Sequence, residues 1–213
     1  MLLKTLALTA STLALPVAQA AEPAPYVMLH LGGSNLSSRP ASVDFGAGVT
    51  AQGGVTLDGG VHGGLAVGRQ TENARFEVEY QHGSFDVTGR SLGSVRQAAS
   101  DNGHYDALTA NAYRTFALNT KLSAFAGGGI GWGKTAMPRG GRIGACDCFP
   151  AASKGGLLYQ VRLGADYALG NGHHLMAQYT WISLPRADSG GTPSVSYPRR
   201  GVNVLSAAYR KTF

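Results

Sequence analysis

The sequence predicts an all-β protein, an eight-stranded antiparallel up-and-down β-barrel, and three observations favour that fold. Glycine contributes 31 of 213 residues and charged residues only 14%, and each glycine costs roughly 1 kcal/mol in a helix interior. Apolar and polar residues alternate with period two in several segments, as on strands with one apolar face. Short and long connections between these segments also alternate along the chain. Together these features exclude helical bundles and disordered chains.

The N-terminus has the pattern of a cleavable export signal. Lys4 is the basic region, residues 6–15 are apolar, and Ala18-Gln19-Ala20 is a small-x-small cleavage site. The apolar stretch of roughly 10 residues is too short for a spanning helix, which needs about 20. We therefore expect residues 1–20 to be removed. Loss of Lys4 lowers the formal net charge from +6 to +5, and no later apolar run is long enough for a membrane helix.

The clearest strand is 157–169, where every odd position is apolar and the even positions include Gln160, Arg162 and Asp166. A tight turn at 170–172, Gly-Asn-Gly, links it to a second alternating segment. Both parities are mixed in 105–116, so the inward face of that strand stays undetermined. The expected strands are 25–33, 59–70, 75–81, 105–116, 122–132, 157–169, 174–182 and 202–213.

The connections favour a barrel that spans a membrane. Those near 70–74, 117–121 and 169–173 are short, whereas 34–58, 86–103, 135–155 and 184–199 are long and rich in Gly, Ser, Pro and Arg. Membrane barrels combine short periplasmic turns with longer extracellular loops. A soluble barrel with its apolar side inward is the alternative. We expect residues 21–213 to form one transmembrane barrel whose four long loops are extracellular.

The chain resembles the small OmpA-like and opacity-type outer-membrane β-barrels. The resemblance lies in the signal peptide, the segment PYVMLHLGGS at 25–34, the segment FAGGGIGWG at 125–133 and the terminal Phe213. It implies a bacterial outer-membrane location and surface roles in adhesion, immune exposure or envelope integrity. It also implies an assembly signal for the barrel-assembly machinery, kept in part by Tyr209 and Phe213. Lys211 stands where this family usually has an aromatic residue.

Residues 128–135, GGIGWGKT, match the phosphate-loop pattern G-x-x-x-x-G-K-[ST]. That loop binds phosphate where it follows a strand and opens a helix. Here the glycines fall within an expected strand, and Pro138, Gly140 and Gly141 follow instead of a helix. We therefore predict no nucleotide and no other cofactor. The glycines are interpreted as space for neighbouring inward side chains in a narrow barrel.

A set of polar residues on the expected strands could line the barrel lumen. Paired carboxylates can act in acid–base catalysis, and rings of charge can gate a pore. Eight strands leave just enough room for side chains to fill the interior, so we favour a filled, charge-neutralised lumen. The residues concerned are Glu77, Glu79, Arg114, Gln160, Arg162 and Asp166.

Histidines and cysteines indicate no catalytic or metal site. His173 and His174 are adjacent, so on a strand they point to opposite faces. His62, His82 and His104 have no second ligand at a telling spacing. A lipid A enzyme remains a minor alternative, and we predict that the chain is not an enzyme. Cys146 and Cys148 are expected to form a disulfide in an oxidising compartment, with metal capture or pairing to another chain as alternatives.

The basic excess falls in the long loops. Guanidinium groups suit planar phosphate and carboxylate groups, so lipopolysaccharide or anionic host ligands are the expected partners, and nucleic acid is not. A rim that only neutralises lipopolysaccharide is the alternative reading of this charge. We expect an adhesin or surface-antigen role, with a narrow passive channel for small polar solutes as the alternative function. The loop arginines are Arg39, Arg90, Arg96, Arg139, Arg142, Arg186, Arg199 and Arg200, and Arg139, Arg142, Arg199 and Arg200 are the strongest candidates for anion contact.

Overall fold

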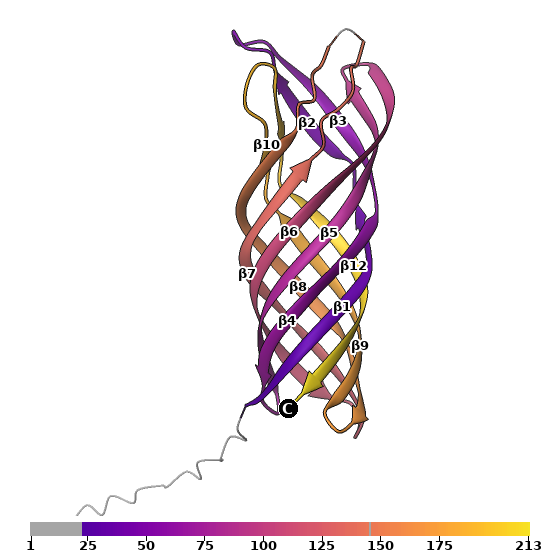
Figure 1. The fold of residues 1–213 in the computed structure, drawn as a ribbon, viewed down its shortest axis with the longest axis vertical. Coiled ribbons are helices and arrows are strands. Elements are labelled where there is room, and N and C mark those ends of the chain that lie inside the picture. Colours follow the sequence, from indigo (N-terminus) through magenta and orange to yellow (C-terminus); the bar gives the residue numbers. More distant parts are fainter. Residues whose placement is uncertain (1–22, 145) are drawn as a thin grey trace, which may run out of the picture.

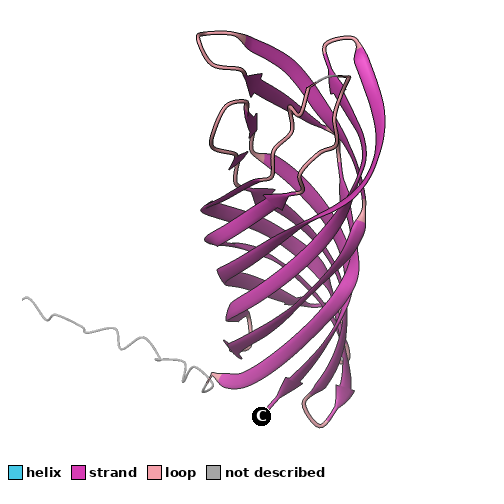
Figure 2. Ribbon diagram, turned by 45° about the horizontal axis from the view of Figure 1, so that its top comes forward, coloured by secondary structure: helices cyan, strands magenta, loops and turns pink. Residues whose placement is uncertain are grey.

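A computed structural model describes residues 23–144 and 146–213, and it shows a closed antiparallel barrel with a tall extension at one end (Figure 1). The predicted signal segment, residues 1–20, lies outside the described residues. Strands make up most of the described chain (Figure 2). None of its described segments is a helix long and apolar enough to cross a membrane.

Eight strands form the closed ring, in agreement with the predicted fold. Each of the eight expected segments lies within or overlaps one of them. Closure is made by β1, which pairs with β4 on one side and with β12 on the other. The ring strands are β1 (Ala24–Leu36), β4 (Gly60–Gln70), β5 (Ala74–Leu92), β6 (Val95–Ala117), β7 (Leu122–Met137), β8 (Ala152–Gly170), β9 (His173–Leu184) and β12 (Arg200–Thr212).

The two ends of the barrel differ. At the turn end lie the connections 71–73, 118–121 and 171–172, together with the start of β1 and the end of β12 (Figure 1). The tight turn before β9 is built by Gly170, Asn171 and Gly172, all with positive φ, which is a conformation that glycine adopts without steric cost. The opposite end, called the long-loop end below, carries all the long connections.

One long connection differs from the expectation. Residues 86–103 are not a loop, because β5 and β6 continue through them as a paired hairpin that turns at Gly93 and Ser94. The sequence there is polar and rich in small residues, which is typical of loops. It forms strands because each strand lies beside the other and satisfies its backbone hydrogen bonds in register. Its polar side chains are exposed because this hairpin lies beyond the part of the barrel whose outer surface is apolar.

Four short strands extend the barrel at the long-loop end. β2 (Arg39–Asp44) and β3 (Thr50–Asp58) form a hairpin in the first long loop, and β10 (Ala187–Asp188) and β11 (Ser194–Tyr197) lie in the fourth. β11 pairs with β2, and β3 pairs with β5, so two loops far apart in sequence join one sheet. This pairing gives the long-loop end an ordered β-structure.

The side chains follow the predicted alternation. On β8, Leu163 is 52% exposed and neighbouring Arg162 is fully buried. On β6 the odd positions face inward, as Tyr105 and Tyr113 show, which settles the face that the sequence left open. The ring therefore carries an apolar outer surface around a lumen of polar and apolar side chains, as in membrane barrels.

The glycine-rich segment 127–133 is part of β7, so the phosphate-loop pattern has no helix to open. Built side chains at Gly127 and Gly129 would collide with Tyr113 and Asn111, two inward residues of β6. The glycines therefore make room for larger neighbours in the lumen, as predicted from the sequence.

Candidate functional site

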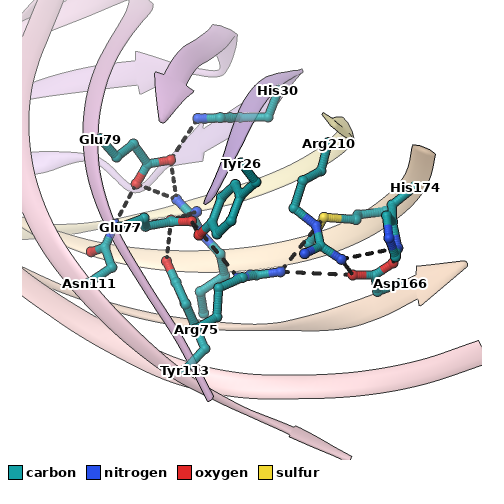
Figure 3. A network of polar contacts seen from close by, with 12 residues as sticks. Tyr26, His30, Arg75, Glu77, Glu79, Asn111, Tyr113, Asp166, His174 and Arg210 are labelled. Carbon is teal, nitrogen blue, oxygen red and sulfur yellow. Dashed lines mark hydrogen bonds and ion pairs between the residues drawn. The ribbon is translucent and has the colours of Figure 1, made fainter. Parts of the chain in front are cut away.

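The centre of the lumen is an ion-pair cluster of Glu77 and Glu79 on β5 with Arg162 on β8. The guanidinium Nη2 of Arg162 lies 2.8 Å from Glu79 Oε1, and its Nη1 lies 3.3 Å from Glu77 Oε1. All three side chains are fully buried. Tyr26 and Tyr113 donate hydrogen bonds of 2.6 and 3.0 Å to Glu77 (Figure 3). Buried charges need such pairing, because leaving one alone costs several kcal/mol.

Amide and imidazole groups complete the cluster. Asn111 Nδ2 and Gln160 Nε2 donate to Glu79 over 2.9 and 3.0 Å, and His30 Nε2 lies 2.8 Å from the same carboxylate. Gln81 Nε2 donates to Gln160 Oε1 over 2.8 Å. These groups come from β1, β5, β6 and β8, so the network ties strands together across the lumen.

A second cluster lies nearer the turn end. Asp166 accepts a hydrogen bond from Arg210 and lies 2.8 Å from His174 Nδ1 (Figure 3). The guanidinium of Arg75 lies 4.4 Å from the centroid of the Phe125 ring and contacts Asp166 at 3.9 Å. Three arginines therefore match three carboxylates in the buried network of this half of the barrel. The charges of the network are balanced, and each carboxylate accepts hydrogen bonds from neighbouring side chains.

The other half of the lumen is mainly apolar. Side chains of the ring strands and of the extension form one buried cluster that includes Phe85, Leu158 and Ile182. The connection between β7 and β8 adds Cys148 and Phe149, both fully buried, to the same cluster. This connection therefore enters the mouth of the barrel as a plug. Ion pairs and hydrogen-bonded polar groups dominate the turn-end half, whereas the long-loop half is mainly apolar and also encloses Arg39 and Arg90.

Five of the six predicted lumen residues lie in this interior. Glu77, Glu79, Gln160 and Arg162 form the central cluster, and Asp166 forms the second. Arg114 is the exception.

The prediction for Arg114 is wrong, because it occupies an even position on β6, whose odd side faces inward. Its guanidinium is exposed and lies 5.9 Å from the Phe116 ring centroid. Sequence reasoning left Arg75 and Arg210 out of the site. Both share the polar parity of their strands, and that signal could have identified them.

The structure joins Cys146 and Cys148 in the predicted disulfide. His173 and His174 point to opposite faces as expected, with His173 beside Tyr209 on the outside and His174 in the second lumen cluster. Tyr209 and Phe213, the two aromatic residues of the expected assembly signal, are both exposed on the outer surface. No group of His, Cys, Asp or Glu in the described residues is arranged to hold a metal ion.

The loop arginines do not form one surface. Arg39 and Arg90, expected in exposed loops, are instead 1% and 6% exposed, because they occupy the inward faces of β2 and β5. Arg139 pairs with Asp147, and Arg142 is exposed without a carboxylate partner among the described residues.

Arg199 is the last residue of the fourth long connection, and Arg200 is the first residue of β12. Arg199 donates to the backbone oxygens of Ser183 and Leu157 over 3.2 and 2.7 Å. Arg200 is half-buried, and its Nε has no hydrogen-bond acceptor in the described chain.

A cleft of about 720 Å³ lies at the long-loop end between the β2–β3 hairpin, the segment 185–199 and the start of β8. Three cationic side chains line it, from Lys154, Arg186 and Arg199. Of these, Lys154 was not identified from the sequence. The cleft volume lies in the range of small-molecule sites, about 300–1,000 Å³.

Asp188 forms ion pairs with two of the cationic side chains that line this cleft. Lys154 Nζ and Arg186 Nε contact the Asp188 carboxylate at 2.9 and 3.0 Å, and Ser196 Oγ donates to it over 2.8 Å. Partial burial acts to raise the pKa of Asp188. The hydrogen bonds and the positive charges outweigh that effect and hold the pKa below its usual value. The carboxylate is therefore ionised and neutralises one of the three cations.

Comparison with known proteins agrees with this architecture. Residues 5–197 match the family model described as outer membrane protein beta-barrel domain. Among curated proteins, none matches this chain in sequence.

Two solved structures share the fold. Neisserial surface protein A, NspA, is 18% identical, with a TM-score of 0.55 over 89% of this chain and 97% of that one. The outer membrane protein OprG of Pseudomonas aeruginosa is 11% identical, with a TM-score of 0.60 over 88% of this chain and 96% of that one. The family match and the fold together show that this chain belongs to the outer-membrane β-barrel proteins and resides in the bacterial outer membrane.

Proposed function

We propose that this protein binds anionic ligands at the cell surface through its long-loop end and is not a pore. In outer-membrane barrels the short turns are periplasmic and the longer loops extracellular, so the long-loop end faces outward from the cell. The observation that carries the proposal is the ordered sheet at this end, where β11 pairs with β2 and β3 with β5. An ordered platform holds side chains in place for binding at a lower entropic cost than a mobile loop does.

The charge of the platform supports an anionic ligand. Arg96, Arg142, Arg186 and Arg199 are all exposed at this end, and such side chains attract anions from solution. Without the expected signal segment, which carries Lys4, the chain has a formal net charge of +5. Lipopolysaccharide phosphates and the sulfate or carboxylate groups of host glycans both satisfy this chemistry.

The filled lumen argues against the alternative function, a passive channel. A conducting path would have to pass the ion pairs of Arg162 with Glu77 and Glu79 and then the apolar cluster around Phe85 and Phe149. Opening it requires separation of buried charges as well as withdrawal of the plug. Transport through this interior is therefore disfavoured in the closed structure.

Reversing charge at the long-loop end should weaken binding of a polyanion. We expect the variant Arg139→Glu, Arg142→Glu, Arg199→Glu and Arg200→Glu, in detergent or nanodiscs, to bind immobilised dextran sulfate at least about tenfold more weakly. The loss should shrink as ionic strength rises, because salt screens exposed charges.

The control is Lys121→Glu, which reverses an exposed charge at the turn end and should bind as the wild type does. Gel mobility with and without boiling verifies that each variant forms the barrel. Equal binding by the fourfold variant and the wild type would refute the proposed function.

A further inference from the structure

We infer that the cleft lined by Lys154, Arg186 and Arg199 is a binding site for a phosphorylated saccharide. The inference rests on the proposed function and assigns it a location and a ligand class. It starts from the charge balance of the cleft. Asp188 contacts both Lys154 and Arg186, and among the described residues Arg199 contacts no carboxylate. Three cations against one anion leave the cleft with an excess of about two positive charges.

The cationic groups are accessible to a ligand. The side chains of Lys154 and Arg186 are 52% and 59% exposed although both contact Asp188. Arg186 uses Nε for Asp188 and Nη2 for Ser196, which fixes the plane of its guanidinium and leaves Nη1 free. A guanidinium held in this way presents donors that match phosphate oxygens.

The remaining lining suits a sugar. Ser42 and Gln52 contribute a hydroxyl and an amide, which are donors and acceptors for sugar hydroxyl groups, and the Ser196 hydroxyl, which donates to Asp188, has acceptor capacity only. Gly155 and Gly156 leave one wall without bulky side chains, and the rings of Pro40, Pro185 and Pro198 border the others. The cleft is thus concave and sets cationic and polar groups among prolines and glycines, whereas the described outer wall of the barrel carries no such groups in its apolar belt. A lipid tail fits that outer wall, and a phosphorylated saccharide fits the cleft.

The position of the cleft relative to the membrane surface agrees with a phosphorylated saccharide as its ligand. Arg199 lies 5.4 Å from the ring centroid of Tyr159, and Tyr159 lies 5.7 Å from Trp181, ring centroid to ring centroid. Aromatic residues of this kind mark the membrane interface in barrels. The cleft therefore begins directly beyond the outer aromatic girdle, at the level of glycolipid head groups. The same phosphorylated saccharide could come from a lipid of the same leaflet or from solution.

The test compares the variant Lys154→Gln/Arg186→Gln with the wild type in nanodiscs. The soluble probe is the phosphorylated core oligosaccharide of a lipopolysaccharide, used intact and after enzymatic removal of phosphate. We expect the double variant to bind the intact probe at least about tenfold more weakly than the wild type, and the wild type to lose similar affinity for the dephosphorylated probe. Lys121→Gln, which removes an exposed charge at the turn end and outside the cleft, is the control and should bind normally.

Two further comparisons distinguish the source of the ligand and separate failure of the cleft assignment from failure of the proposed function. Nanodiscs with and without lipopolysaccharide distinguish the sources, because bound glycolipid in the leaflet would compete with the soluble probe in the wild type and not in the double variant. If the double variant binds the probe like the wild type while both bind dextran sulfate, the cleft assignment is overturned and the proposed function stands. If the wild type binds neither polyanion, the proposed function fails together with the cleft.

Discussion

Arg162→Met is expected to lower the free energy of unfolding by about 3–5 kcal/mol, because it leaves two arginines against three buried carboxylates and removes the arginine that pairs with Glu79. Arg162 is fully buried, and its guanidinium contacts both carboxylates and donates from Nε to Thr180 over 2.9 Å. Methionine fills much of the same space, so the cost arises from charge and not from a cavity.

Urea unfolding of the protein in lipid vesicles measures this effect. The double variant Arg162→Met/Glu79→Gln should recover most of the lost stability, since it leaves two arginines, Arg75 and Arg210, against two carboxylates, Glu77 and Asp166. The matched control Arg114→Met alters an exposed arginine and should change stability by less than about 0.5 kcal/mol. Equal effects of Arg162→Met and Arg114→Met would contradict the ion-pair network.

Arg39→Met is expected to have the opposite effect and to raise the free energy of unfolding by about 2–3 kcal/mol at pH 8, since removing an unpaired buried charge relieves its desolvation penalty. Arg39 is 1% exposed, and none of its three guanidinium nitrogens has an acceptor among the described residues. Burial and the nearby positive charge of Arg200 lower the pKa of Arg39 to about 10.

The pH dependence of that gain follows from the lowered pKa. The folded state releases the Arg39 proton near pH 10, whereas the unfolded state holds it up to the higher, ordinary pKa of arginine, so the penalty is full below pH 10 and fades as the pH rises above it. The advantage of Arg39→Met should therefore be larger at pH 8 than at pH 11, measured by urea unfolding at both values.

Arg90→Met is the control for this prediction. Arg90 is also buried, but its Nη1 lies 2.8 Å from Asp101, so its loss should destabilise the protein. An Arg39→Met variant less stable than the wild type at pH 8 would show that Arg39 has a stabilising partner.

The barrel was predictable because its signal is local. Alternation with period two on 157–169 assigns each residue to a face without knowledge of its partners, and it placed Arg162 and Asp166 correctly in the lumen. The same rule failed for Arg114, because both parities of 105–116 are mixed and the inward side is decided by Tyr105 and Tyr113 packing against other strands.

The cleft could not be predicted, because its walls meet through long-range pairing. Ser196 lies beside Ser42 only because β11 pairs with β2, and neither segment carries a strong strand pattern of its own. The burial of Arg39 has the same origin, since the β2–β3 hairpin joins the sheet that extends the barrel wall and thereby turns a residue of a polar loop inward. Composition identified the basic character of these loops, but not which cations share a site.

We propose that the lumen is filled and that the protein acts through its long-loop end. Single-channel recording of the wild-type protein in planar bilayers is the most direct test of this proposal. We expect no stable stepwise conductance at neutral pH, because buried ion pairs and the apolar cluster fill the lumen along its length. Long-lived, ion-selective channels of uniform conductance would contradict this interpretation and would make the passive channel the function to pursue.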